Sequence, residues 1–324
     1  MIVTLTPNPS IDSTLALGDK LTRGAVQRLD TVTAVAGGKG INVAHAVFLA
    51  GEETQALFPA GQLDPFVPLV NEIGFPITTV RIPNNVRTNT TVTEPDGTTT
   101  KLNGPGAPLS PEHIEALEKM LIDAVSPEVT WVVLAGSLPP GVPVDWYSQL
   151  TVLIHEKSPT TRVAVDTSDA PLREVGLHLE KPGAAPNLIK PNSLELGQLV
   201  GVDGQDLEER ARGGEFAPII TSASRLVERG IEQVLVTLGD VGAVLVNAEG
   251  AWVASTPKIS AVSTVGAGDC ALAGFILACS RGLSPADSVI QAVSYGSAAA
   301  ALPGTTIPRP DQVTSVGAKI SKVV

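Results

Sequence analysis

The residues best suited to chemistry in this 324-residue chain lie at 263–269, where glycines and an aspartate precede an apolar run that predicts a helix. The first amides of a helix have no acceptor within the helix, and the helix dipole favours negative charge beside them. Gly266, Ala267 and Gly268 therefore predict a backbone cradle for an anion. A carboxylate at Asp269 would repel that anion unless it faced a hydroxyl group. Asp269 is thus a candidate general base that orients an alcohol for attack on a phosphoryl group.

Two other interpretations of this segment stay open. Asp is a favoured N-cap residue, so Asp269 would in the simplest case only cap the helix above a tight glycine turn. Residues 266–271 also fit the G-x-G-x-x-A pattern of dinucleotide binding. The context opposes this second interpretation, because no clear strand precedes the segment and no second strand and helix unit follows it.

A second glycine-rich segment opens another predicted helix, at 41–50. It contains Gly37, Gly38 and Lys39, with Asn42 about one turn later. The ammonium group of Lys39 can neutralise a substrate phosphate, and the amide of Asn42 can hydrogen-bond a sugar hydroxyl. A plain glycine-rich turn with a solvated lysine accounts for the same residues.

Two charged residues near the predicted ligand edge carry similar alternatives. Asp12 follows a proline-rich turn directly after the first strand, and its carboxylate can accept hydrogen bonds from two vicinal sugar hydroxyls. Arg87 begins a predicted hairpin strand and can clamp a phosphate through two parallel hydrogen bonds. A solvated turn Asp and a solvated hairpin Arg are the simpler interpretations.

Residues that follow three other apolar strands have both structural and functional interpretations. Asn192 and Glu195 have the spacing of a capping box, although an acid near phosphates can instead position Mg²⁺ through water. Gly239 and Gly242 fit either backbone contact with a nucleotide or a plain hairpin. Ser137 lacks the G-x-S-x-G pattern of a nucleophile, so we predict a loop residue near substrate.

The elements that must position these residues predict an α/β fold. From residue 111 onward, helical patterns alternate with strands that are apolar on both faces, which indicates a mostly parallel sheet covered by helices on both sides. The predicted strands of this sheet lie at 2–6, 131–135, 163–165, 188–189, 234–238 and 243–246. In such sheets, ligands bind beyond the carboxyl ends of the strands. Thr- and Val-rich stretches at 25–35, 87–93 and 98–102 predict a second, smaller sheet.

Composition excludes several classes of protein. Hydrophobic residues at 43% and charged residues at 17% are typical of a globular chain. The net charge of −11 opposes non-specific binding to nucleic acid or to an anionic membrane. The four histidines show no ligand spacing, so we assign no transition-metal site. The N-terminus lacks a signal-peptide pattern and no apolar run is long enough to span a bilayer, so the cytoplasm is the expected location.

Together, these motifs resemble the ribokinase-like (PfkB) carbohydrate kinases over nearly the whole chain. They occur in that family's order, as T-P-N-P-S-I-D at 6–12, G-G-K-G-I-N at 37–42, R-T-N at 87–89, A-G-S-L-P at 135–139, K-P-N at 190–192 with Glu195, and T-V-G-A-G-D at 264–269. The opening motif joined to G-G-K-G-I-N is the feature to which we give most weight. The pattern is most similar to the branch that phosphorylates sugar phosphates.

The resemblance implies roles for individual residues. It implies that Asp269 is the catalytic base and that the backbone of 266–268 holds the transferring phosphoryl group. It implies contacts with the sugar or its phosphate by Asp12, Gly37, Gly38, Lys39, Asn42, Arg87 and Ser137. It implies contacts with ATP by Lys190, Asn192, Thr237, Gly239 and Gly242, and an arrangement of Mg²⁺, through water, by Asn192 and Glu195.

The resemblance also implies an architecture and an activity. We expect one α/β/α kinase domain over residues 1–324, with a discontinuous β lid from about 12–36 and 86–103 that also supports a homodimer. The expected reaction is ATP- and Mg²⁺-dependent phosphorylation of fructose 1-phosphate to fructose 1,6-bisphosphate. Tagatose 6-phosphate and fructose 6-phosphate are the alternative acceptors.

Overall fold

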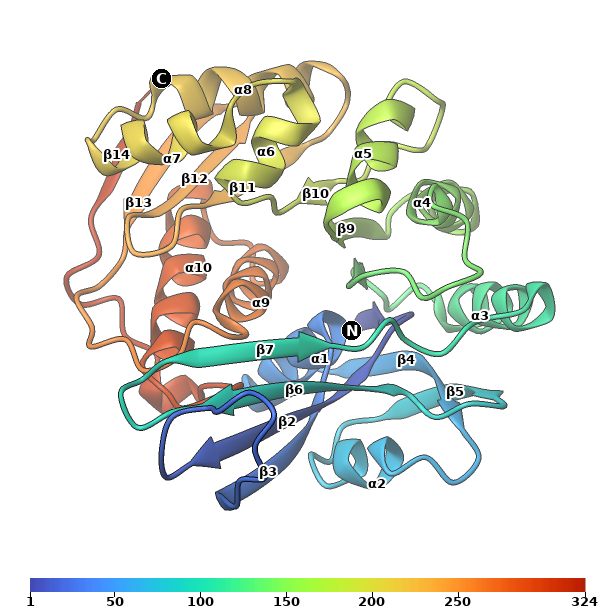
Figure 1. Ribbon diagram of the computed structural model, residues 1–324. Helices are drawn as coiled ribbons and strands as arrows, with labels where there is room; N and C mark the ends of the chain where they lie inside the picture. Colours follow the sequence, from blue (N-terminus) through green and yellow to red (C-terminus); the bar gives the residue numbers. More distant parts are fainter. Residues whose placement is uncertain (324) are drawn as a thin grey trace.

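A ten-stranded sheet forms the middle layer of the molecule (Figure 1). The computed structural model describes residues 1–323. In chain order the strands of this sheet are β1 (Ile2–Leu5), β4 (Thr54–Gly61), β5 (Ile77–Ile82), β8 (Trp131–Ala135), β9 (Arg162–Asp166), β10 (Leu188–Ile189), β11 (Gln233–Thr237), β12 (Gly242–Asn247), β13 (Gly250–Ser255) and β14 (Ile320–Lys322). Across the sheet their order is β14-β13-β12-β11-β10-β9-β8-β1-β4-β5. The strands from β11 to β5 pair in parallel, and β12, β13 and β14 extend one edge with antiparallel pairs.

Helices cover both faces of this sheet. They are α1 (Lys39–Leu49), α2 (Phe66–Asn71), α3 (Pro111–Ala124), α4 (Trp146–Lys157), α5 (Asp169–His178), α6 (Ser193–Val200), α7 (Gly204–Arg212), α8 (Ala217–Glu228), α9 (Ala267–Ser280) and α10 (Pro285–Ala300), with a short 3₁₀ helix at Pro310–Gln312. Alternate residues of β8 enter different cores, because successive side chains of a strand point to opposite faces. Val132 and Leu134 pack with helices α3 to α8, whereas Trp131 and Val133 pack with α1, α9 and α10. The predicted three-layer α/β/α fold is confirmed.

A smaller four-stranded sheet lies beside the large one (Figure 1). Its strands are β2 (Ser10–Leu17), β3 (Leu29–Gly37), β6 (Arg87–Thr93) and β7 (Thr99–Asn103), in the order β3-β2-β6-β7. The predicted hairpin is present, since β6 and β7 pair in antiparallel fashion around a turn in which Gly97 N donates to Glu94 O. The pairing of β2 with β6 is parallel, so two distant segments of the chain share this sheet. Its action as a lid stays a prediction.

The structure corrects the prediction at several strands. Asp12 lies inside β2 rather than in a turn, because Ser10–Leu17 pairs on both sides with β3 and β6. The alternating run at 25–35 begins as a strand only at Leu29, since Thr22 and Gln27 are joined by a local hydrogen bond in the preceding loop. Strands β4, β5, β13 and β14 were not predicted.

Strand β13 precedes the segment 264–269, so the prediction that no clear strand precedes it is wrong. This strand pairs in antiparallel fashion with both of its neighbours, and residues 256–266 separate it from α9. A dinucleotide site instead requires a parallel strand that turns directly into the helix. The conclusion therefore holds for a different reason.

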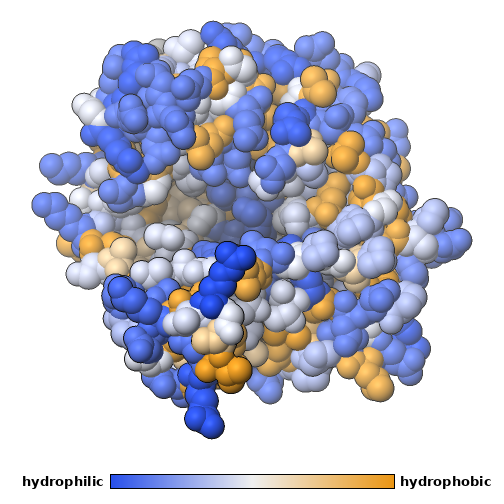
Figure 2. Space-filling view, viewed as in Figure 1, coloured by the Kyte–Doolittle hydropathy of each residue, from blue (hydrophilic) through white to orange (hydrophobic). Residues whose placement is uncertain are grey.

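A hollow in the molecular surface separates the small sheet from the upper part of the molecule (Figure 2). Hydrogen bonds join the start of α1 to the first turn of α9, through Asn42 and Asp269, and to the carboxyl end of β9, through Lys39 and Asp166. Among residues 1–323, no helix combines the length and the apolar character that crossing a membrane requires.

Candidate active site

A carboxylate, an amide and an ammonium group meet at the start of α9. Asp269 Oδ2 accepts a hydrogen bond of 2.8 Å from Asn42 Nδ2. Lys39 Nζ lies 3.8 Å from Asp269 Oδ1. Lys39 is the first residue of α1 and Asn42 lies one turn later, and α1 packs against α9, so both side chains reach Asp269. The fold thereby joins two glycine-rich segments whose contacting residues, Asn42 and Asp269, stand 227 positions apart.

Asp269 does not cap its helix. The N-cap of α9 is Gly266, whose φ of 78° lies in the left-handed region that favours glycine. Among the described residues 1–323, no side chain forms a capping hydrogen bond at this terminus, so the interpretation of Asp269 as a simple N-cap is wrong. Ala267 N already donates a long hydrogen bond of 3.4 Å to Thr264 O. The amides of Gly268 and Asp269 follow it in the first turn, where no intrahelical acceptor is in reach.

The protonation of Asp269 is set by opposing influences. Burial raises the pKa of its carboxyl group and the negative charge of Asp166 raises it further, whereas Lys39, Asn42 and Lys190 act to lower it. The net direction is upward from the ordinary value of 3.8. A raised pKa strengthens the carboxylate as a proton acceptor, which suits a general base.

This shift predicts the pH dependence of the reaction. A general base works only when it is deprotonated, so kcat/KM is expected to fall as the pH falls through the raised pKa of Asp269. The acid limb should therefore lie above pH 3.8, the ordinary carboxyl value. A kcat/KM profile measured at saturating ATP checks this. An acid limb at or below that value would contradict the environment described for Asp269.

Asp166 is the main charged residue of the site that the sequence did not reveal. It ends β9, its side chain is fully buried, and its Oδ1 accepts a hydrogen bond of 3.0 Å from Lys39 Nζ. Lys190 Nζ lies 3.4 Å from its Oδ2. The strand was predicted only to Val165, one residue short of Asp166. An acid at the carboxyl end of a buried strand was the available signal.

Asp12 lies beside the two glycines at the end of β3, Gly37 and Gly38. Asp12 Oδ1 accepts hydrogen bonds from Ser10 Oγ at 2.8 Å and from Asn89 Nδ2 at 3.1 Å. A Cβ atom at Gly37 would overlap the Asp12 carboxylate, so the bare backbone is required for this approach. Gly38 has a φ of 120°, a conformation that side chains rarely tolerate. Asp12 therefore lies against the turn that introduces Lys39 rather than in free solvent.

Arg87 lies at the border of a cavity of about 350 Å³ lined by Asn84, Asn85, Arg87, Thr88 and residues 104–108. One terminal nitrogen of its guanidinium donates to Gly104 O at 3.0 Å. Its Nε is buried and has no hydrogen-bond partner within residues 1–323. Burial lowers the pKa of this group, and the charge of Asp12 opposes that effect. A cation with a free donor beside a cavity is suited to an anionic ligand.

Ser137 is connected to the same loop. Asn8 Nδ2 donates hydrogen bonds of 3.1 Å both to Ser137 Oγ and to Pro105 O. A Cβ atom at Gly106 would overlap the Asn8 side chain, so this contact also depends on a glycine. The two hydrogen bonds of Asn8 thus connect the segment after β7 with the loop after β8. Asn8 belongs to the motif at 6–12, but the sequence analysis predicted no role for it.

The residues predicted on the nucleotide side divide into two groups. Lys190 belongs to the charged centre, because a Cβ atom built on Gly268 would lie 3.3 Å from Lys190 Nζ. Asn192 and Thr237 form an isolated parallel bridge, which places them side by side. Gly239 and Gly242 belong to the turn between β11 and β12, where Leu238 N donates to Gly242 O at 2.8 Å. The plain hairpin interpretation of these two glycines is therefore correct as a description of the backbone.

Asn192 and Glu195 do form the predicted capping box of α6. Asn192 Oδ1 accepts from Glu195 N at 2.8 Å, and Glu195 Oε2 accepts from Asn192 N at 2.9 Å. Burial is the main cause that raises the pKa of Glu195, and the charge of Asp166 adds to it. The charges of Lys190 and Lys39 act in the opposite direction on the pKa of Glu195.

Asn192 and Glu195 are suited to an Mg²⁺ ion that is bound together with the phosphates of a nucleotide. In the part of the chain that the structure describes, no three His, Cys, Asp or Glu side chains form a cluster that could hold a metal ion. Mg²⁺ commonly keeps several waters and is bound by one or two carboxylates together with substrate phosphates. Glu195 uses only Oε2 in the capping box, so Oε1 remains for such a contact.

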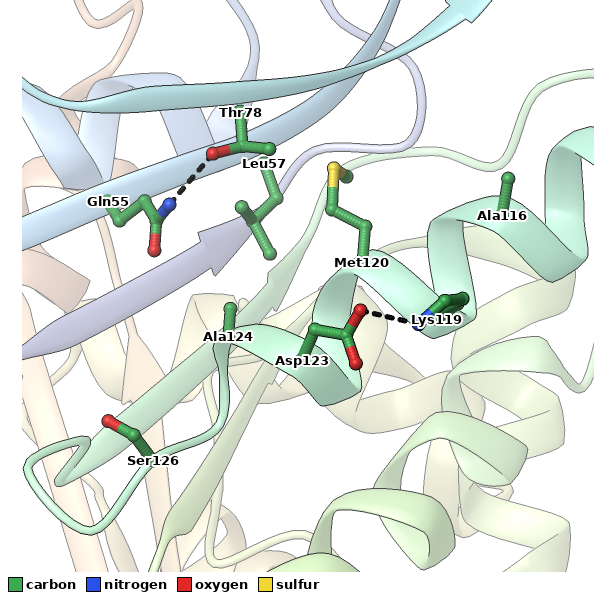
Figure 3. A pocket seen from close by; sticks show the side chains of 9 residues that line it. All are labelled: Gln55, Leu57, Thr78, Ala116, Lys119, Met120, Asp123, Ala124 and Ser126. Carbon is green, nitrogen blue, oxygen red and sulfur yellow. Dashed lines mark hydrogen bonds and ion pairs between the residues drawn. The ribbon is translucent and has the colours of Figure 1, made fainter.

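A second hollow, of about 600 Å³, lies away from this charged centre, between α3 and strands β4 and β5 (Figure 3). Four of its polar side chains pair with one another, Gln55 with Thr78 and Lys119 with Asp123, and Ser126 donates to Glu128 outside the lining. Neither Asp269 nor any of its charged neighbours lines it. The charged centre at α9, and not this hollow, is therefore the candidate active site.

A mostly parallel sheet with a buried carboxylate beside the amide-rich start of a helix, and with two lysines close by, is an arrangement suited to a phosphotransferase that acts on an alcohol. Comparison with known proteins gives the family. The chain belongs to the pfkB family of carbohydrate kinases, whose model matches residues 6–312. It is therefore a sugar kinase, and the kinases of this family use ATP with Mg²⁺.

Individual relatives agree with this assignment. The chain is 36% identical over 279 residues to a 1-phosphofructokinase of Xanthomonas campestris pv. campestris, covering 85% of this chain and 83% of the relative. It is 32% identical to a 1-phosphofructokinase of Rhodobacter capsulatus, covering 99% of this chain and 96% of the relative. Phosphofructokinase-2 from Escherichia coli, solved in complex with substrates and products, superposes with a TM-score of 0.84 at 30% identity and covers 96% of both chains.

Proposed function

We propose that this protein transfers the γ-phosphoryl group of ATP to the 6-hydroxyl of fructose 1-phosphate, giving fructose 1,6-bisphosphate and ADP. The observation that carries this proposal is the position of Asp269. Its buried carboxylate lies in the first turn of α9, hydrogen-bonded to Asn42 and close to Lys39. The 1-phosphofructokinases that the chain resembles over most of its length support the choice of acceptor.

The residues of the chain perform the transfer as follows. Asp269 orients the 6-hydroxyl and accepts its proton as the new oxygen–phosphorus bond forms and the bond to the β-phosphate oxygen breaks. The amides of Gly268 and Asp269 donate to the transferring group, with the positive end of the helix dipole behind them. Lys190, next to Gly268, offsets charge on the nucleotide phosphates.

Other residues hold the sugar phosphate. Asp12 and Asn42, with the backbone at Gly38, bind hydroxyl groups of the sugar. Arg87 and Lys39 bind its phosphate, and Ser137 contributes a hydroxyl from the loop after β8. The buried Nε of Arg87, which has no partner within residues 1–323, supports this assignment, because a phosphate would satisfy it.

Thr237, Gly239 and Gly242 line the nucleotide beyond Lys190 in this proposal. When bound, Mg²⁺ neutralises charge on the nucleotide phosphates, and Asn192 and Glu195 hold it, mainly through water.

The acceptor is tested by measuring ADP release with fructose 1-phosphate, fructose 6-phosphate, tagatose 6-phosphate and fructose. The proposal predicts the highest kcat/KM with fructose 1-phosphate and little activity without a phosphate on the sugar. Because the structure is similar to phosphofructokinase-2 of E. coli, fructose 6-phosphate is the most important alternative acceptor in this assay. A preference of tenfold or more for another acceptor would replace fructose 1-phosphate in this proposal while leaving the kinase assignment intact.

The small sheet serves as a lid and as a dimer contact in our proposal. Strand β3 is an edge strand of this sheet, and its Leu29, Val32 and Val35 are 39%, 59% and 43% exposed. An edge strand with exposed apolar side chains favours pairing with another chain.

Val32→Lys is expected to convert a dimer into a monomer, because a charge would be buried in the contact. Sedimentation at micromolar concentration measures the mass. Val144→Lys is the matched control, since Val144 is 50% exposed and lies outside the small sheet. A monomeric wild-type protein at that concentration would remove the proposed dimer.

A further inference from the structure

The two lysines of the active site share one carboxylate. Both oxygens of Asp166 lie within hydrogen-bond distance of Lys39 Nζ, at 3.0 and 3.2 Å. Lys190 Nζ lies 3.4 Å from Oδ2 of the same group. Lys39 comes from the start of α1 and Lys190 follows β10, so Asp166, at the end of β9, joins a helix and a neighbouring strand end.

Burial makes this arrangement energetically demanding. The side chain of Asp166 is 0% exposed and that of Lys190 is 5% exposed. Charges removed from water to this extent are tolerated only when they are paired. Two ammonium groups drawn to one point would repel each other without the carboxylate between them. Asp166 therefore determines where both groups lie.

The position of each lysine gives Asp166 a consequence for the reaction. Lys39 Nζ is also 3.8 Å from the Asp269 carboxylate, on the side where the acceptor binds. Lys190 Nζ is next to Gly268, at the amides that would receive the transferring group. The charges thus run in the order Asp269, Lys39, Asp166, Lys190.

We propose that Asp166 is a positioning residue, which holds the acceptor-side cation Lys39 and the nucleotide-side cation Lys190 at a fixed separation on either side of the transferring phosphoryl group. This inference rests on the proposed function for the side that each lysine serves. Asp166 touches neither substrate. It acts through the two lysines, and its loss affects both substrates together.

Three single variants test this, each assayed for the KM of fructose 1-phosphate and of ATP. Lys39→Met is expected to raise the KM of fructose 1-phosphate at least tenfold and to change that of ATP less than threefold. Lys190→Met is expected to do the reverse. Asp166→Asn is expected to raise both KM values at least fivefold and to lower kcat, because the amide carries no charge to offset the two ammonium groups and its NH₂ group faces Lys39 in either orientation. Lys119→Gln, in an exposed ion pair on α3, is the control and should change neither KM.

The pH profile gives a readout that a purely structural role would not move. Asp166 raises the pKa of Asp269, and its removal also leaves Lys39 to interact with Asp269 alone. Both effects lower the pKa of the base, so the acid limb of kcat/KM should move to lower pH in Asp166→Asn. Asp166→Glu keeps the charge and should retain the wild-type limb, with a lowered kcat because the carboxylate is displaced by one methylene group.

Thermal unfolding checks whether each variant is folded. A double variant provides a second control. If Asp166→Asn does not fold because two lysines are left without their counter-charge, Lys190→Met with Asp166→Asn removes the excess positive charge. The proposal then predicts a KM for fructose 1-phosphate at least fivefold above that of Lys190→Met alone.

The outcomes distinguish a failure of the proposed function from a failure of the inference about Asp166. If the lysine variants fail to divide between the two substrates, the proposed function assigns the sides of the site wrongly. If they divide as expected but folded Asp166→Asn, or the double variant, keeps KM within twofold of its reference, the inference about Asp166 is overturned.

Discussion

Replacing Asp269 by Asn is expected to lower kcat by roughly 10²–10⁴-fold, the range that a positioned general base contributes. The amide cannot take the proton of the attacking hydroxyl. Its oxygen can still accept the hydrogen bond from Asn42 Nδ2, so the first turn of α9 should keep its geometry. Lys39 also retains Asp166 as a counter-charge. The loss should therefore appear in turnover rather than in folding or in ATP binding.

The measurement is kcat for Asp269→Asn at saturating fructose 1-phosphate and ATP, together with the Kd of ATP by calorimetry. Asp123→Asn is the matched control, because Asp123 is an exposed carboxylate in an ion pair with Lys119. The control should keep wild-type kcat. A kcat for Asp269→Asn within tenfold of the wild type would show that another group accepts the proton.

Replacing Arg87 by Met is expected to have the second largest effect, an increase of about 10- to 150-fold in the KM of fructose 1-phosphate. Hydrogen bonds to charged groups are worth about 1.5–3 kcal/mol, and each 1.4 kcal/mol is a factor of ten. Arg87 lines the 350 Å³ cavity, its buried Nε has no hydrogen-bond partner within residues 1–323, and Met fills similar space without a donor. The KM of ATP should change little, since Arg87 begins β6 in the small sheet and not a nucleotide-side element.

Steady-state kinetics with each substrate varied in turn checks this prediction. Arg81→Met is the matched control, because Arg81 is an exposed arginine near the end of the edge strand β5. Arg87→Lys should recover only part of the affinity, because an ammonium group cannot make the two parallel hydrogen bonds of a guanidinium. Equal increases in both KM values would place Arg87 outside the sugar-phosphate site.

Local signals allowed much of the candidate site to be predicted. Glycines before an apolar helix mark both Gly266–Asp269 and Gly37–Asn42, and the strand-end rule explains why such segments converge. The structure brings Asp269, Asn42 and Lys39 together as these signals suggested. What each residue does in the reaction remains a prediction.

Features that depend on distant partners were harder to predict. Asp166 is defined by its contact with a lysine 127 positions away, and no local pattern marks that relation. Lys190 was assigned only through the family resemblance, since its burial beside Asp166 is a property of the fold. Strand β2 was read as a polar stretch, because its neighbours in the sheet, and not its own alternation, make Ser10–Leu17 a strand.

The central claim is that the carboxylate of Asp269 receives the proton of a sugar-phosphate hydroxyl. A crystal structure with fructose 1-phosphate and a non-hydrolysable ATP analogue tests it most directly. The account predicts the 6-hydroxyl oxygen within about 2.6–3.2 Å of a carboxylate oxygen of Asp269, with the 1-phosphate at Arg87. A 6-hydroxyl bound beyond hydrogen-bond reach of Asp269, with both ligands ordered, would contradict it.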